Sequence, residues 1–142
     1  MQNEPLVFER VYNAPIKKVW EALSNKDEMK KWYFDLAEFK AEPGFEFSFL
    51  AGPKGKQFLH KCKVTEAIHE KKLSYTWRYD GYDGDSEVSF ELFPEGDKTK
   101  LRLTHTGLET FPAIEDFKKE NFVMGWTHFV HTALKNFLEP AI

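Results

Sequence analysis

Apolar and polar side chains alternate along much of the chain, and this period of two predicts β-strands. The first alternating run is Leu6–Tyr12, and six more runs follow between residues 37 and 106. These six predicted strands cover residues 37–41, 45–49, 58–67, 73–79, 88–92 and 101–105. Turn-forming residues separate several of them, as at Pro43-Gly44 and Gly52–Gly55. Short turns between alternating strands predict one antiparallel sheet with one face to bury.

Two short helices are predicted between the first strand and the rest of the sheet. Apolar residues at helical spacing predict a helix over residues 16–24, directly after the segment Asn13-Ala14-Pro15. Asn13 is the candidate N-cap of this helix, because its side-chain oxygen can accept a hydrogen bond from the first turn. A second short helix is predicted over residues 27–32, capped by Asp27 or Asn25.

One long helix is predicted near the C-terminus, from Ala113 to about Leu138, and Pro140 ends it. Its apolar stripe consists of Phe122, Trp126, Phe129, Val130, Ala133, Leu134 and Phe137. Because only this long helix is available to cover the sheet, the sheet must curl around it. The predicted fold class is α+β: a curved antiparallel sheet wrapped around one long C-terminal helix, with two short helices after the first strand. At 142 residues we expect a single domain spanning residues 1–142.

Three segments carry a family resemblance: Glu9–Leu23, Lys31–Phe34 and Gly125-Trp126 with the helical turns that follow. Together with the order of elements, they resemble the helix-grip fold of the START-like (SRPBCC) superfamily. More narrowly, the chain resembles the family named for homology to the activator of heat-shock protein 90 ATPase. The family's pattern is an Ala-Pro, a Val-Trp-Ala-Leu-like helix, a Trp-Phe pair and a Gly-Trp near the C-terminus. The resemblance spans nearly the whole chain, and it implies either a pocket for lipid-like or aromatic molecules or a co-chaperone role in the stress response.

The chain departs from that family pattern at two places. Tyr33 stands between Trp32 and Phe34, where the family has an adjacent aromatic pair. His128 and His131 follow Gly125-Trp126 and are not part of the pattern. Both departures touch the expected pocket, so the resemblance does not carry a ligand identity to this chain.

Aromatic residues make up 16% of the chain, as 14 Phe, 5 Tyr and 4 Trp, and such residues dominate apolar cores and pockets. A curved sheet that grips one helix tends to leave a space lined from both sides, so we expect a ligand cavity there. The candidate binding residues on the strands are Phe47, Phe49, His60, Cys62, Tyr75, Trp77, Tyr79, Phe90 and His105. The helix adds Phe122, Trp126, Phe129 and Val130, and Trp32 and Phe34 are expected near the mouth. The equally weighted alternative is a solid core without a cavity.

Two histidines and one cysteine are the candidates for chemistry on the buried face. His105 and His60 are predicted to point inward, where each is able to orient a ligand carbonyl or to act as a general base. The favoured alternative for both is a half-buried imidazole bonded to the backbone. Cys62 is also predicted to point inward, and no neighbouring charge in the pattern would activate its thiol.

No cofactor or metal is predicted. His128 and His131 are three residues apart on one helix, but a usable metal site wants a third ligand. The acidic run around Asp83 does not have the spacing of a calcium loop, and a single cysteine excludes disulfides and cysteine-rich zinc sites.

Charge and hydropathy exclude several classes of partner. The chain has 20 Lys+Arg against 23 Asp+Glu, a net charge of −3, which argues against a nucleic-acid partner. No apolar stretch approaches the roughly 20 residues that a membrane span needs, and the first residues do not have the pattern of a signal peptide. We therefore expect a cytoplasmic protein without membrane insertion, present as a monomer or a weak homodimer.

Three functions follow in order of preference. The first is binding of a small hydrophobic molecule, lipid-like or aromatic, between sheet and helix. The alternative is an interaction protein that stimulates a heat-shock protein 90 ATPase, with a basic contact face made by Lys17, Lys18, Lys30 and Lys31. The third is a cyclase or hydrolase with His105 or His60 as the base. We rank it lowest because no acid–base pair has convincing spacing, and so we lean against an enzyme.

Overall fold

The computed structural model describes residues 5–34, 36, 38–51, 58–112 and 117–139. Its strands are β1 (Leu6–Tyr12), β2 (Glu46–Ala51), β3 (Phe58–Ile68), β4 (Lys72–Tyr79), β5 (Ser86–Glu95) and β6 (Lys98–Thr106). Its helices are α1 (Ile16–Ser24), α2 (Lys26–Trp32), the 3-10 turn η1 (Leu108–Thr110), α3 (Lys119–His128), the π turn η3 (Phe129–Ala133) and α4 (Leu134–Leu138).

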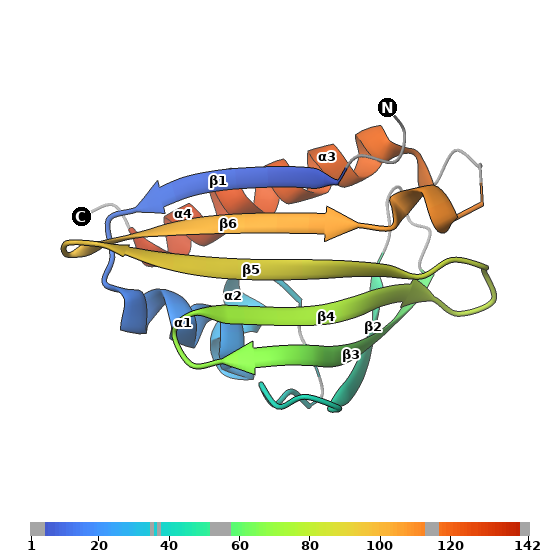
Figure 1. The fold of residues 1–142 in the computed structure, drawn as a ribbon, viewed down its shortest axis with the longest axis horizontal. Coiled ribbons are helices and arrows are strands. Elements are labelled where there is room, and N and C mark those ends of the chain that lie inside the picture. Colours follow the sequence, from blue (N-terminus) through green and yellow to red (C-terminus); the bar gives the residue numbers. More distant parts are fainter. Residues whose placement is uncertain (1–4, 35, 37, 52–57, 113–116, 140–142) are drawn as a thin grey trace.

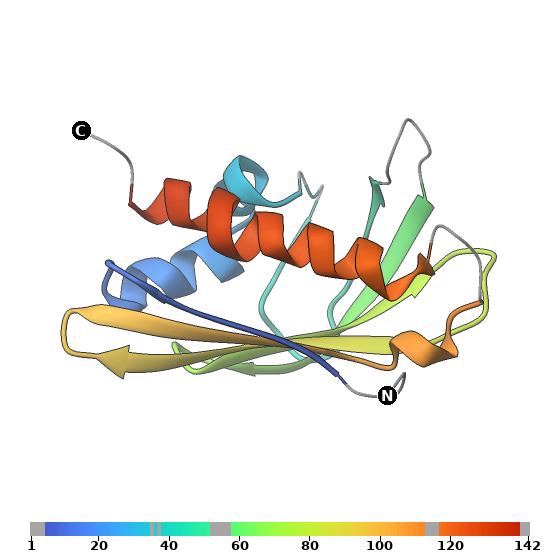
Figure 2. The same cartoon turned by 90° about the horizontal axis from the view of Figure 1, so that it is seen from above.

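The six strands form one antiparallel sheet in the order β1-β6-β5-β4-β3-β2 (Figure 1). Strands β2 to β6 follow one another as a meander, and β1 closes the other edge by pairing with β6. The predicted antiparallel sheet is confirmed. Since β1 joins the last strand, the two short helices that follow β1 are carried to the end of the sheet where α4 ends (Figure 2).

The C-terminal helical segment crosses one face of the curved sheet, and α1 and α2 lie on that same side (Figure 2). The predicted α+β helix-grip architecture is therefore confirmed. The segment is interrupted in the middle by η3, whose wider π turn frees a backbone carbonyl from the usual helical ladder. The hydroxyl of Tyr12 donates to the carbonyl of Val130 at 2.6 Å, and this ties β1 to the turn.

Alternation places most apolar strand residues on the buried side, as the sequence predicts, while Val7, Val11, Leu50 and Ile68 are exposed. The buried positions of β4 are Leu73, Ser74, Tyr75, Trp77 and Tyr79, and β6 buries every second residue from Thr99 to His105. A bulge between Val64 and Glu66 shifts the register of β3 against β4. Bulges bend a strand and increase its twist, so this one contributes to the curvature around the helix.

The predicted strand over residues 37–41 is wrong for residues 38–41, which form no ladder, while residue 37 lies outside the described residues. Phe39 is buried against Phe45 and Phe47 without strand pairing. The chain enters the sheet only at Gly44 and Phe45, which exchange backbone hydrogen bonds with Val64. The alternation before Pro43 therefore reflects packing of an irregular segment. The predicted turn at residues 52–55 also lies outside the described residues.

Two predicted helix starts also need correction. The long C-terminal helix begins at Lys119, because Lys118 has an extended backbone, and residues 113–116 of the predicted helix lie outside the description. Helix α1 begins after Pro15, which occupies the N-cap position, so Asn13 does not cap it. The backbone N–H of Asn13 instead donates to Glu139 at 2.8 Å. At α2 the capping prediction is confirmed, since the side chain of Asn25 accepts hydrogen bonds from the first turn.

In the part of the chain that the structure describes, no helix is both long and apolar enough to cross a membrane.

Candidate ligand-binding cavity

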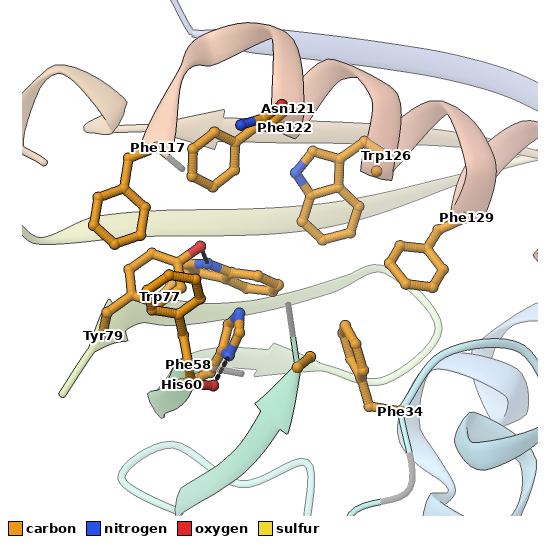
Figure 3. A pocket seen from close by; sticks show the side chains of 12 residues that line it. Phe34, Phe58, His60, Trp77, Tyr79, Phe117, Asn121, Phe122, Trp126 and Phe129 are labelled. Carbon is orange, nitrogen blue, oxygen red and sulfur yellow. Dashed lines mark hydrogen bonds between the residues drawn. The ribbon is translucent and has the colours of Figure 1, made fainter. Parts of the chain in front are cut away.

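A cavity of about 380 Å³ lies between α3 and the ends of β3 and β4 that face it (Figure 3). Its lining is mostly aromatic. The residues around it are Phe34, Ala51, Phe58, His60, Trp77, Tyr79, Phe117, Asn121, Phe122, Gly125, Trp126 and Phe129. The space between helix and sheet is therefore not packed solid at this end. This argues against the alternative, left open by the sequence, of a solid core without a cavity.

The two walls of the cavity follow from the two periodicities of the sequence. Phe122 and Trp126 are four residues apart on α3, so both project from one face of the helix towards the sheet (Figure 3). Trp77 and Tyr79 are two residues apart on β4 and point towards the helix. Residue His60 of β3 pairs directly with Tyr79 and extends the sheet wall. The cavity is thus bounded by rings on both sides.

Beside the cavity, Tyr33 occupies the space between sheet and helix. Its hydroxyl lies 2.6 Å from that of Tyr75, and its ring contacts those of Trp126 and Phe129 at centroid distances of 6.2 and 5.0 Å. Phe34 follows it and stacks on Phe49 at 4.2 Å. The extra aromatic residue noted in the sequence therefore fills one part of the interior and confines the hollow to the other.

His105 sits behind the cavity in a continuous chain of hydrogen bonds. The indole N–H of Trp126 donates to its Nδ1 at 3.0 Å, which leaves Nε2 to carry the proton and donate to the Ser86 hydroxyl at 2.9 Å. Ser86 in turn donates to the Trp77 carbonyl at 2.7 Å. Burial lowers the pKa of His105 to about 3, because the charged imidazolium would be stripped of water. Both ring nitrogens are engaged, so neither is available to a ligand as a base.

His60 is held differently, with one ring nitrogen fixed. Its Nδ1 lies 2.9 Å from the carbonyl of Phe58, an acceptor, so Nδ1 carries the proton (Figure 3). Its ring stacks on Phe49 with centroids 4.5 Å apart and meets Trp77 edge-on. Burial lowers the pKa of His60 to about 4, so the imidazole is neutral at neutral pH.

The structure brings seven of the fifteen predicted binding residues to the cavity wall: Phe34, His60, Trp77, Tyr79, Phe122, Trp126 and Phe129. The other eight lie outside the wall, in the surrounding core: Trp32, Phe47, Phe49, Cys62, Tyr75, Phe90, His105 and Val130. Among these, the thiol of Cys62 is buried, and burial raises its pKa, so it stays protonated. A direct role in binding stays a prediction for all fifteen.

The sequence analysis missed five residues of the described lining: Ala51, Phe58, Phe117, Asn121 and Gly125. Phe58 shares the alternating face of His60, so the strand pattern held the signal for it. Phe117 precedes α3 and shows no periodicity. Gly125 carries a different signal, because glycine in a helix interior costs about 1 kcal/mol relative to alanine. A Cβ added there would meet nothing within 4 Å, which is consistent with a position facing open space.

Metal ligation finds no support among the residues described. No group of three or more His, Cys, Asp or Glu side chains lies close enough to hold an ion in the described ranges. His131 has its Nδ1 3.3 Å from an amino nitrogen of Arg10. A guanidinium at that distance disfavours a second cation.

The helix-grip fold and its aromatic cavity define a START-like protein. The chain belongs to the family described as Activator of Hsp90 ATPase homolog 1-like proteins, whose model matches residues 13–139. The resemblance seen in the sequence is thereby confirmed. No curated protein matched the chain.

Solved structures agree over almost the full length. Protein CV1439 from Chromobacterium violaceum is 25% identical with a TM-score of 0.80, covering 99% of this chain and 100% of that one. Protein MLL2253 from Mesorhizobium loti is 27% identical with a TM-score of 0.78, covering 98% and 99%. Protein BH1534 from Bacillus halodurans is 30% identical with a TM-score of 0.75, covering 95% and 96%.

Proposed function

We propose that this protein binds a small hydrophobic molecule in the cavity between α3 and the sheet. The observation that carries the proposal is the cavity itself, about 380 Å³ in volume with rings on both walls. Ligand pockets span roughly 300–1,000 Å³ and are mostly apolar with a few polar groups. This cavity falls at the small end of that range, which fits a molecule of a few fused rings or a short branched chain.

The chemistry of the wall favours an uncharged ligand. Among the described lining residues none carries a charge at neutral pH, because the imidazole of His60 is neutral and the rest are apolar, aromatic or amide side chains. A charged group moved from water into such surroundings loses its hydration without a partner, and that costs several kcal/mol.

Binding is measurable without a label, because Trp77 and Trp126 are part of the wall. We expect a saturable change in tryptophan fluorescence, and a rise in melting temperature, with at least one member of a panel of flavonoids, fatty acids and sterols. Ligands that bind only the folded state raise its stability by an amount that grows with the logarithm of their affinity and concentration. A panel that gives no saturable response would count against the proposal.

A space-filling variant tests the location. Gly125→Phe places a ring at the lining position where a Cβ has open space. Met124→Phe adds the same ring to the adjacent position, whose side chain is 70% exposed, and serves as the matched control. We expect Gly125→Phe to bind the identified ligand at least tenfold more weakly than Met124→Phe, without loss of melting temperature, since phenylalanine is a better helix former than glycine. Equal binding by the two variants would place the ligand elsewhere.

A co-chaperone role is the second candidate, and the family's description supports it. Lys17, Lys18 and Lys31 line one surface groove, but Glu21 and Glu28 lie in the same groove. The amino group of Lys18 also donates to the carbonyl of Leu138 at the end of α4, so it stabilises the helix. The surface is mixed in charge rather than basic, which is why we rank this role second. An unchanged heat-shock protein 90 ATPase rate at high excess of this protein would remove it.

A further inference from the structure

The cavity wall presents a hydrogen-bond acceptor on the ring of His60. Because Nδ1 of His60 donates to the Phe58 carbonyl, Nε2 has no proton and carries a lone pair. Figure 3 shows this second nitrogen on the edge of the ring that faces α3. Among the described residues, the side-chain hydrogen bond of His60 joins Nδ1 to the Phe58 carbonyl at 2.9 Å, and His60 belongs to the cavity lining.

A hydrogen-bond donor belongs to Tyr79, the residue that pairs with His60 across the strands. The hydroxyl oxygen of Tyr79 accepts a hydrogen bond from the indole N–H of Trp77 at 2.9 Å. Its own proton has no acceptor in the part of the chain that the structure describes, so it is available to the cavity. Tyr79 and His60 are cross-strand partners, and their ring centroids are 4.7 Å apart. In Figure 3 the hydroxyl oxygen of Tyr79 lies on the helix side of its ring, and Nε2 of His60 lies on the helix side of the imidazole.

The two atoms together complement a group that both donates and accepts at one atom, and a hydroxyl does this. We propose that the ligand carries a neutral hydroxyl group, phenolic or alcoholic, that donates to Nε2 of His60 and accepts from the Tyr79 hydroxyl. This inference rests on the proposed binding of a hydrophobic molecule in the cavity. A ketone would satisfy only Tyr79, and it would leave the imidazole nitrogen without a partner.

The same wall selects against carboxylates. A carboxylate has no proton to donate to Nε2, and its charge would face the lone pair at close range. In the described part of the lining no lysine or arginine is present to compensate for that charge. The inference therefore separates hydroxyl-bearing ligands from fatty acids, although both are amphipathic.

Three probes of similar size test the selectivity on the unmodified protein: 2-naphthol, 2-methylnaphthalene and 2-naphthoate. Isothermal titration at neutral pH gives the dissociation constant of each. We expect 2-naphthol to bind about tenfold more tightly than 2-methylnaphthalene, equivalent to about 1.4 kcal/mol, because two hydrogen bonds form in a site of low polarity. We expect 2-naphthoate to bind more weakly than either.

A pair of variants assigns the preference to the named atoms. Tyr79→Phe removes the donor, and Tyr82→Phe is the control, since its ring contacts Phe58 and Phe117 near the cavity while its side chain is 40% exposed. We expect Tyr79→Phe to reduce the preference for 2-naphthol over 2-methylnaphthalene to about threefold, because one of the two hydrogen bonds remains, and Tyr82→Phe to keep the tenfold preference. His60→Phe should reduce the preference in the same way.

The outcomes separate this inference from the function on which it rests. If 2-methylnaphthalene binds and 2-naphthol binds no better, the hydroxyl recognition is overturned while the hydrophobic cavity stands. If 2-naphthoate binds most tightly, the hydroxyl recognition is also overturned. If none of the three binds, and the wider panel also fails, the proposed function itself falls. The probe comparison needs no variant, so it decides the question even if Tyr79→Phe fails to fold.

Discussion

Two buried neutral histidines make the stability of this protein fall as the pH is lowered. Burial lowers the pKa of His105 to about 3 and that of His60 to about 4, whereas an unfolded histidine titrates near 6.5. Below about pH 6.5 these two histidines therefore bind protons in the unfolded chain but stay neutral in the folded chain. The free energy of unfolding is fully retained above that pH and is lost progressively down to the folded pKa values.

The size of the loss follows from the linkage relation. Between about pH 7.5 and about pH 5, each histidine lowers the free energy of unfolding by about 2 kcal/mol. The loss accumulates over the roughly 1.5 pH units between the unfolded pKa near about 6.5 and about pH 5, at about 1.36 kcal/mol per pH unit. The two together reach about 4 kcal/mol. That is a large fraction of the roughly 5–15 kcal/mol by which a domain is stable.

Urea unfolding at the two pH values measures this loss, and a variant isolates the part due to His105. His105→Gln removes the titrating group but offers an amide to the same neighbours, Trp126 and Ser86. We expect it to be less stable than the unmodified protein at neutral pH, yet to lose about 2 kcal/mol less on acidification. His69→Gln is the control, since the side chain of His69 is 78% exposed. If His105→Gln and the unmodified protein lose the same stability on acidification, the reasoning is refuted.

Two further changes test the hydrogen bonds around the cavity. Ser86→Ala removes the buried acceptor of His105, and we expect a loss of about 1–3 kcal/mol in urea unfolding, against little change for the exposed control Ser48→Ala; equal losses would contradict the network. Tyr12→Phe removes the hydroxyl that bonds to the Val130 carbonyl, and we expect about 1 kcal/mol of destabilisation with faster amide exchange at the π turn. Unchanged exchange there would show that the bond does not hold the turn.

The sequence predicts the faces of the elements better than it predicts the cavity. Alternation correctly points Trp77 and Tyr79 towards the helix, and helical spacing does the same for Phe122 and Trp126. Periodicity does not say how far along a strand the helix crosses it. For this reason the pattern could not separate Phe47, which packs in the core, from His60, which lines the cavity.

The sequence pattern also could not place side chains that come from irregular segments. Tyr33 decides how much of the interior stays open, but its position depends on the chain path after α2, which no periodicity encodes. Phe117 reaches the cavity from outside any long element for the same reason. The hydrogen bonds of His105 were not predictable from the sequence either, because its partners Ser86 and Trp126 come from β5 and α3.

The π turn has a consequence for the phase of the C-terminal helix. Its buried side chains recur at every fourth residue: Phe122, Trp126, Val130, Leu134 and Leu138. In an uninterrupted α-helix a repeat of four drifts by about 40° at each step, or about 160° over the whole run. The extra residue in the π turn reduces that rotation by about 100°, so the buried side chains at both ends of the helix face the same sheet. Deleting one residue there would let the turn close into a regular α-helix and would keep Leu134 and Leu138 on the face of Phe122 and Trp126. Straightening the turn without a deletion would instead swing Leu134 and Leu138 off the core.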